Sequence, residues 1–495
     1  MYGRCTVVSG MLRGVHVDPV YVEVAISSGI PLFSIVGMGD TAIQESRERV
    51  RAALKSSGFD MPQARCVVNL APSALKKSGT GFDVAIALAI MVITGQAPPT
   101  VVQGRLFVGE LSLEGFVRPV NGLLAFGLTA RELGLELVCA REGSQTVDIA
   151  QLSQVGIGTL RDLVTGNFTP LTPERFNTGE PQLDFRDIGG NEVAKRALQI
   201  AATGQHGILM MGPPGSGKTM LASRLPSILP DLSEQEALES ALIHSVAGLD
   251  ISSILSGIRP FRAPHHSASS AGLIGGGTPV RPGEISLAHN GVLMLDEFAE
   301  FKPAVLQGMR QPMETGSVVV TRADGSITFP ARFMLVGASN PCACGYLGDR
   351  ERPCTCTQAQ IHGYRNRIGG PLLDRIDMHI DVARVPPERI MDAGSGTSSE
   401  QLKAGVLAGR EYASWRKARH PVEPSTAGVI SSCKLEDEDL RFFEKACRAN
   451  KMSGRAMVRT LGVARTIADI AQRESVTKGD LCEALTYRPH EVGSS

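Results

Sequence analysis

Residues 207–219 read GILMMGPPGSGKT, an apolar stretch that runs directly into the pattern G-x-x-x-x-G-K-T. Its glycines let the backbone turn tightly and direct N–H groups at phosphate oxygens, and the helix expected next adds the positive end of its dipole. Lys218 is expected to reach the β- and γ-phosphates of a nucleotide, and Thr219 to bind Mg²⁺. The expected nucleotide-binding residues here are Gly212, Pro213, Pro214, Gly215, Ser216, Gly217, Lys218 and Thr219.

Two later apolar stretches end in polar residues of the kind that nucleotide hydrolysis needs. GVLMLDEFAE, 291–300, contains Asp296, expected to hold magnesium through its water shell, and Glu297, expected to activate the attacking water. Buried strands rarely end in paired acids without a cation or a proton to manage. FMLVGASN, 333–340, ends at Asn340, which is expected to sense the γ-phosphate or to position the water.

Arginines further along the chain are candidates for completing the site. Arg375 lies on a short segment past the third stretch and is expected to act in trans, as an arginine finger on a neighbouring subunit's nucleotide. A surface salt bridge with Asp374 or Asp377 is the structural alternative. In the helical tail, Arg455 is expected to close over the γ-phosphate, with Arg459 one turn later as its competitor.

Length and composition restrict the class of protein. A chain of 495 residues is too long for one hydrophobic core, and 50 basic against 50 acidic residues argue against coating nucleic acid by bulk charge, although a local basic pore remains compatible. The apolar run 84–93 is half the ~20 residues that span a bilayer, and the N-terminus has no signal-peptide pattern. We expect a cytoplasmic protein without a membrane partner, with Cys66, Cys139 and Cys482 as reduced core residues.

The pattern of elements predicts an α/β chain with several domains. Between residues 185 and 385, short apolar strands alternate with helices, which indicates a parallel sheet with crossover helices. The predicted units are 1–165 as a mixed α/β domain, 166–184 as a linker, 185–385 as the nucleotide-binding core, 386–430 as connecting helices and 431–495 as a small helical lid. In the first unit we expect strands at 21–27 and 65–72, a helix at 40–58 and a buried helix at 81–93.

Four of the ten cysteines lie in one short loop, CACGYLGDRERPCTC, 342–356. Four thiolates around a tetrahedral Zn²⁺ would form a structural site with no open catalytic position. Disulfides are disfavoured in a reducing cytosol, so reduced structural cysteines are the alternative. The predicted zinc ligands are Cys342, Cys344, Cys354 and Cys356.

These motifs in this order resemble those of the AAA+ ATPases. FRDIGGNEVAKRAL, 185–198, is similar to their adenine-contacting entry segment, with Ile188 in the apolar role. Residues 262–298 resemble the clade of magnesium chelatase and the minichromosome maintenance helicases, in which an insertion in the second helix and a hairpin before the third strand project into a hexamer's pore. The hairpin here would be SVVVTRADGSITFPA, 317–331, with Arg322 near its tip. Arg322 is the candidate for gripping DNA phosphates, and a solvated tip arginine is the alternative.

The N-terminal unit resembles the proteolytic domain of Lon, of the ribosomal S5-like superfamily. The similar segments are 69–90 and 108–135. Lon proteases use a Ser-Lys dyad, but the serine position falls at Gly81 and the lysine position at Leu124, and neither residue serves as nucleophile or base. A shifted dyad would draw on nearby residues, namely Ser78, Thr80, Lys76 and Lys77. We expect a non-proteolytic domain that forms rings or contacts DNA.

Together, the Lon-like unit and the magnesium-chelatase-like core resemble the ComM/YifB family over nearly the whole chain. The resemblance implies a hexameric, ATP- and Mg²⁺-dependent helicase that drives branch migration during recombination in natural transformation, with single-stranded or branched DNA as its partner. The alternatives are a protein-remodelling motor like the chelatase ATPase subunit and an ATP-dependent protease. The missing Ser-Lys pair argues against the protease, and the extra domain and the cysteine loop argue against the chelatase subunit.

Overall fold

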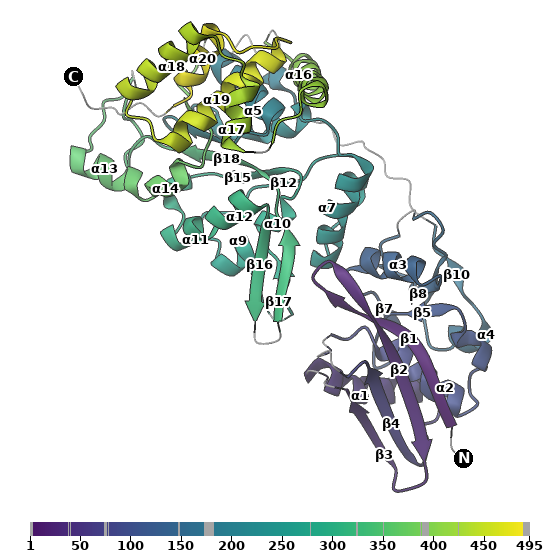
Figure 1. Cartoon of the computed structure of the whole chain (residues 1–495). Coiled ribbons are helices and arrows are strands. Elements are labelled where there is room, and N and C mark those ends of the chain that lie inside the picture. The colour runs from purple at the N-terminus through teal and green to yellow at the C-terminus, as the bar shows by residue number, and fades with distance from the viewer. Residues whose placement is uncertain are drawn as a thin grey trace.

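The computed structural model describes residues 3–37, 39, 41–73, 77, 79–146, 149–172, 183–277, 279–322, 325–349, 351–386, 388, 396–423 and 425–488. Figure 1 shows an N-terminal domain beside a larger body that contains a sheet and the C-terminal helices. The chain therefore has the mixed α/β architecture, with a parallel sheet and a helical C-terminal part, that the sequence predicts.

The N-terminal domain is built on an eight-stranded sheet in the order β10-β9-β8-β5-β1-β2-β4-β3. Helix α2, Asp83–Ile93, is buried from Asp83 to Met91, as its continuous apolar sequence predicts. The expected strands and the other expected helix also form, as β2, β4 and α1. The strands are β1 Gly3–Arg13, β2 His16–Ser27, β3 Leu32–Val36, β4 Arg65–Ala71, β5 Arg105–Phe107, β8 Glu136–Ala140, β9 Gln154–Ile157 and β10 Thr169–Pro170, with a separate pair, β6 Glu110–Leu111 and β7 Val117–Arg118; the other helices are α1 Thr41–Ser56, α3 Leu123–Glu132 and α4 Asp162–Thr165.

This sheet extends past residue 165, the predicted end of the first unit. Thr169 and Pro170 pair with Gly156 and Val155, so β10 forms one edge of the sheet. Of the cysteines expected in the core, Cys66 and Cys139 are buried, but Cys482 is exposed. The prediction for Cys482 is wrong because its helix turns that position outward while the neighbouring Leu481 fills the core.

The second body contains a five-stranded sheet in the order β12-β15-β18-β11-β19, and every neighbouring pair is parallel. The carboxyl ends of all five strands consequently meet at one edge. The strands are β11 Ile208–Met211, β12 Phe261–Arg262, β15 Val292–Leu295, β18 Met334–Ser339 and β19 Met378–Asp381, and the helices around them are α5 Glu192–Gly204, α6 Lys218–Ser223, α7 Glu234–Ala247, α8 Ser252–Leu255, α10 Glu284–Leu287, α11 Pro303–Gly308, α12 Arg310–Thr315, α13 Gln358–Asn366 and α14 Gly370–Leu373.

Two small β elements stand apart from this sheet. The expected hairpin forms from β16, Ser317–Arg322, and β17, Gly325–Pro330, and Figure 1 shows it projecting from the body. Its turn residues, 323 and 324, lie outside the described residues. The insertion forms α9, Ser270–Ile274, and a pair of short strands, β13 Gly275–Gly276 and β14 Arg281–Pro282.

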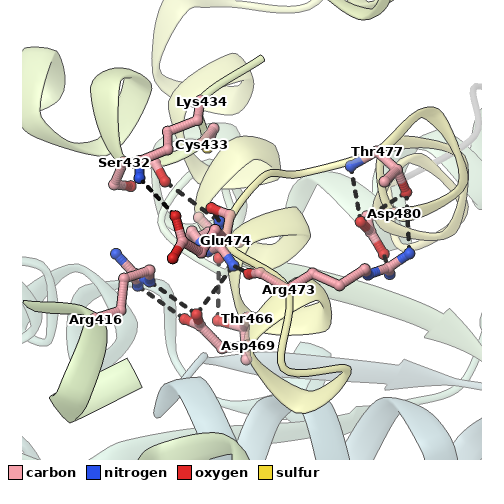
Figure 2. A network of polar contacts seen from close by, with 12 residues as sticks. Arg416, Ser432, Cys433, Lys434, Thr466, Asp469, Arg473, Glu474, Thr477 and Asp480 are labelled. Atoms are coloured by element: carbon pink, nitrogen blue, oxygen red, sulfur yellow. Dashed lines mark hydrogen bonds and ion pairs between the residues drawn. The ribbon is translucent and has the colours of Figure 1, made fainter. Parts of the chain in front are cut away.

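The C-terminal helices pack around a buried acid. Asp469 in α19 accepts hydrogen bonds at 2.9 Å from Nε and Nη2 of Arg416 in α16, and Nη2 of Arg465 lies 3.1 Å from it (Figure 2). All three side chains are at most 6% exposed. The helices are α16 Ser399–Arg419, α17 Thr426–Ser432, α18 Asp437–Ala449, α19 Gly454–Ile470 and α20 Lys478–Thr486.

Candidate nucleotide and metal sites

The G-x-x-x-x-G-K-T loop connects β11 to α6 at the carboxyl edge of the parallel sheet. Two of its glycines, Gly215 and Gly217, have φ of 78° and 88°, in the left-handed region that glycine adopts without strain. A Cβ added to Gly212 would lie 2.1 Å from the carbonyl oxygen of Val382, so only glycine allows this approach to the segment after β19. The loop therefore has the geometry of a phosphate cradle.

Lys218 is buried and turned into this loop. Its Nζ donates to the carbonyl oxygens of Gly212 and Pro213 at 2.8 and 2.9 Å, and burial lowers the pKa of its ammonium group. Asn191 lies in the segment 185–198, but the sequence predicted no role for it; it braces the loop by donating to the Ser216 carbonyl at 3.3 Å. Ile188, expected near adenine, is 6% exposed and packs in the core that the sheet shares with the C-terminal helices.

The two residues expected to hold magnesium are in contact. The Thr219 hydroxyl donates to Oδ2 of Asp296 at 2.8 Å, although 77 residues separate them in the sequence. The backbone N–H of Glu297 donates to Oδ1 of the same aspartate at 2.8 Å. A hydroxyl and a carboxylate at the end of a phosphate cradle are the oxygen ligands that Mg²⁺ takes in nucleotide sites, so these residues fit the ion.

The carboxylate of Glu297 is held by a histidine of the insertion. Nδ1 of His266 lies 2.9 Å from Oε2 of Glu297, and the Glu297 backbone is left-handed with φ of 50°. The neighbouring His265 makes a different contact, at 2.8 Å, with the hydroxyl of Ser267. The sequence contained no pattern that pairs His266 with Glu297, because the two lie on separate segments.

Asn340, the predicted sensor, follows β18 and lies beside the phosphate cradle. The backbone N–H of Gly212 donates to the carbonyl of Ser339 at 3.2 Å, which joins the two strand ends. A Cβ on Gly345 of the cysteine loop would be 2.9 Å from Cδ of Pro214 and 3.9 Å from Cγ of Asn340. The cysteine loop therefore packs against both the cradle and Asn340.

The four cysteines of this loop converge on one point. Their sulfur atoms all lie within 4.8 Å of one another, and the closest pairs, Cys342 with Cys344 and Cys344 with Cys354, are 3.4 and 3.6 Å apart. Four ligands at ~2.3 Å around a tetrahedral zinc would be about 3.8 Å apart, whereas a disulfide requires about 2.05 Å. Backbone N–H groups of Tyr346 and Thr355 lower the pKa of the Cys344 thiol to about 5, whereas desolvation and the neighbouring Cys344 raise the pKa of the Cys354 and Cys356 thiols. Without a metal, the cluster therefore favours one thiolate, at Cys344. The set fits a structural Zn²⁺.

Arg375 and Arg455 lie at the opposite, amino edge of the sheet and share a carboxylate. Nη2 of Arg375 is 2.7 Å and Nη2 of Arg455 is 3.2 Å from Oε1 of Glu314 in α12. The ion-pair partner of Arg375 is thus Glu314, and not Asp374 or Asp377, the two partners considered from the sequence. Arg459, the competitor of Arg455, instead bonds the Arg375 carbonyl and Asp377.

The Lon-like dyad positions are occupied by packing residues. Leu124 is 2% exposed and packs against α7 of the ATPase core, and Gly81 carries no side chain. Of the shifted-dyad candidates, Lys77 is buried with Nζ donating to the Pro72 carbonyl, and Thr80 donates to Glu110 at 2.7 Å. Ser78 and Lys76 lie outside the described residues.

A parallel sheet whose carboxyl edge joins a phosphate cradle, a Thr–Asp pair and a strand-end Glu defines a P-loop ATPase of the AAA+ class. Similarity to known proteins assigns the chain to a narrower group within this class. The family description "Magnesium chelatase, subunit ChlI" matches residues 184–390, its C-terminal counterpart matches 396–488, and "Subunit ChlI of Mg-chelatase" matches 22–142. The chain belongs to the ComM/YifB family within this magnesium-chelatase-like group.

Relatives in that family match over nearly the whole length of both chains. The competence protein ComM of Haemophilus influenzae is 40% identical over 488 residues, 96% of this chain and 95% of the relative. YifB of Escherichia coli is 39% identical over 483 residues, and Rv2897c of Mycobacterium tuberculosis is 37% identical over 495 residues, each across 96% of this chain and 95% and 97% of the relative. Among the described residues, no helix is long and apolar enough to cross a bilayer.

Proposed function

We propose that this chain is an ATP-hydrolysing ring motor that translocates on DNA, and specifically a hexameric branch-migration helicase that promotes recombination in natural transformation and has single-stranded or branched DNA as its partner. The observation that carries the proposal is the β16–β17 hairpin, which projects from an ATPase core with Arg322 exposed at its tip. A relative of similar length is named a competence protein, which fits a role in handling incoming DNA.

The positions of Arg375 and Arg455 support the assembly of several chains into a ring. The P-loop lies at the carboxyl edge of the sheet and Arg375 and Arg455 at the amino edge, so neither reaches the nucleotide of its own chain in this arrangement. In a head-to-tail ring, the amino edge of one subunit can face the carboxyl edge of the next. Arg375 then stabilises charge on the neighbour's γ-phosphate, and Arg455 closes the same site.

Within each site, the chain's own residues have separate tasks. Lys218 leaves its two carbonyl partners to contact the β- and γ-phosphates, and Asn340 positions the attacking water. Glu297 accepts the proton of that water. Thr219 and Asp296 would hold Mg²⁺, which supplies charge neutralisation of the phosphates when bound.

The cysteine loop is proposed to hold a structural zinc through Cys342, Cys344, Cys354 and Cys356. The Gly345–Pro214 contact makes this metal a brace for the phosphate cradle and for Asn340, not a reactant. Four reduced thiols in one loop suit the cytoplasm, where we place the protein.

The test is ATP hydrolysis by the full chain with no DNA, with single-stranded DNA and with forked DNA, followed by strand displacement. We expect DNA to stimulate hydrolysis and the fork to be unwound. If the chain is confirmed to form a hexamer but DNA does not stimulate ATP hydrolysis and no strand is displaced, the helicase function is refuted.

The second candidate is a protein-remodelling motor of the magnesium-chelatase type. It is favoured by the match of the ChlI descriptions to all three parts of the chain. It predicts ATP hydrolysis that DNA does not stimulate, so the same assay separates the two functions.

A further inference from the structure

The turn between β1 and β2 belongs to the N-terminal domain but packs against the hairpin of the ATPase core. Val15 in this turn is 8% exposed and lies in an apolar cluster with Ile243 of α7 and Phe329 of β17. Gly14 has φ of +63°, and a Cβ added to it would lie 2.9 Å from Cγ2 of Ile327 in β17. The turn is therefore fixed against the hairpin by close packing.

This packing places Arg13 at the hairpin tip. A Cβ added to Gly325 would lie 3.4 Å from Nη2 of Arg13, and Gly325 pairs with Arg322 across the tip. A Cβ added to Gly276 of the insertion would lie 3.8 Å from Nη2 of Arg322, and Gly276 pairs with Arg281. Three arginines from three separate segments thus come together around one tip.

The three arginines form a local excess of positive charge in a chain with no net charge. Arg13, Arg281 and Arg322 are exposed, and no ion pair to a carboxylate of the described part of the chain involves them. His16, which pairs with Arg13 across the β1–β2 turn, is exposed on the same side. Exposed guanidinium groups that no carboxylate neutralises can attract phosphates through their positive charge, which arginine and lysine share.

We propose that Arg13, Arg281 and Arg322 form one phosphate-binding surface for the sugar–phosphate backbone of DNA, to which the N-terminal domain contributes Arg13. The inference rests on the proposed DNA translocase and extends it to the N-terminal domain. That domain acts as part of the DNA grip, held in register with the hairpin by Val15 and Gly14. The contacts are to phosphates, so binding is independent of base sequence.

The test compares Arg13→Gln and Arg322→Gln with Arg4→Gln in the full chain. Arg4 is an exposed arginine at the far end of the same strand, about 30 Å from Arg13 at ~3.3 Å per residue. Anisotropy of a fluorescein-labelled oligothymidine gives the affinity over a series of salt concentrations. One lost phosphate contact lowers the slope of log K against log salt by about 0.7 for a single strand, which is about fivefold in affinity at 0.1 M salt.

We expect Arg13→Gln and Arg322→Gln each to show this loss and this smaller slope, Arg4→Gln to match the unmodified chain, and Arg13→Lys to retain most of the affinity. Equal melting temperatures of the variants establish that the fold is intact. If Arg13→Gln binds like Arg4→Gln while Arg322→Gln is weakened, the inference is overturned and the DNA translocase stands. If Arg13→Lys loses as much as Arg13→Gln, charge is not the cause and the inference also fails. An unmodified chain that does not bind the oligonucleotide overturns the proposed function itself.

Discussion

A mixture of two inactive variants, Lys218→Ala and Arg375→Ala, is expected to recover ATP hydrolysis. Lys218 lies after the carboxyl end of β11, whereas Arg375 lies near its amino end, where Gly207 donates to Asp377 at 3.0 Å. From Gly207 to Met211, the last residue of β11, the chain takes four steps of ~3.3 Å, so the two ends are about 13 Å apart. We therefore expect the two residues to serve different nucleotides, and each variant retains the residue that the other lacks.

The size of the recovery follows from counting interfaces. In a ring assembled from equal amounts, half of the subunits carry Lys218 and half of their neighbours carry Arg375, so about a quarter of the interfaces are complete. If the sites hydrolyse ATP independently, the mixed ring has about a quarter of the unmodified rate. An arginine that acted within its own chain would restore nothing, because every chain carries one lesion.

The assay uses co-expressed variants with two different tags, purified over both, and phosphate release as the readout. Lys218→Ala mixed with Glu297→Gln is the matched control, because both lesions fall on the same side of an interface and no interface is repaired. Recovery no greater than in this control would refute action of Arg375 in trans.

Three further outcomes test the site and the lid. Asp469→Asn is expected to lower the free energy of unfolding by about 3–5 kcal/mol in urea titrations, since it leaves two buried guanidinium groups without their carboxylate. Glu474→Gln removes a solvent-exposed ion pair with Lys434 and is the control, expected to leave the unfolding midpoint close to that of the unmodified chain. Elemental analysis is expected to find about one zinc per chain, and Cys344→Ser is expected to lose this metal. The variant should also bind a fluorescent ATP analogue more weakly, because Gly345 no longer braces Pro214. Full nucleotide affinity in the metal-free variant would contradict the bracing role of the metal. His266→Ala is expected to raise kcat for ATP hydrolysis without DNA and to leave KM little changed, because the Glu297 carboxylate is released from its contact with His266. His265→Ala is the control. An unchanged kcat in His266→Ala would argue against a restraint of Glu297 by His266.

Much of the candidate nucleotide site could be predicted from motifs whose residues are contiguous in the sequence. The phosphate cradle, Asp296 and Glu297 follow from local patterns because a strand, a turn and the first turn of a helix are specified by neighbouring residues. The cysteine cluster could be predicted for the same reason, since all four thiols lie within fifteen positions of one loop. In each case, the residues that act together are also close in the chain or at the ends of adjacent parallel strands.

The sequence by itself determined the class of fold and the presence of a cysteine cluster, and it predicted the residues of the nucleotide site that the structure brings to one edge of the sheet. Only the tertiary structure decided that Glu314, 61 residues away, takes the Arg375 side chain, that His266 holds Glu297, and that Arg13 lies at the tip of a hairpin more than 300 residues later. Such pairs depend on how separate segments pack, and hydrophobic periodicity records which face of a segment is buried but not which segment covers it. The direction of the parallel strands, set by the sheet as a whole, put Arg375 and the phosphate cradle at opposite edges.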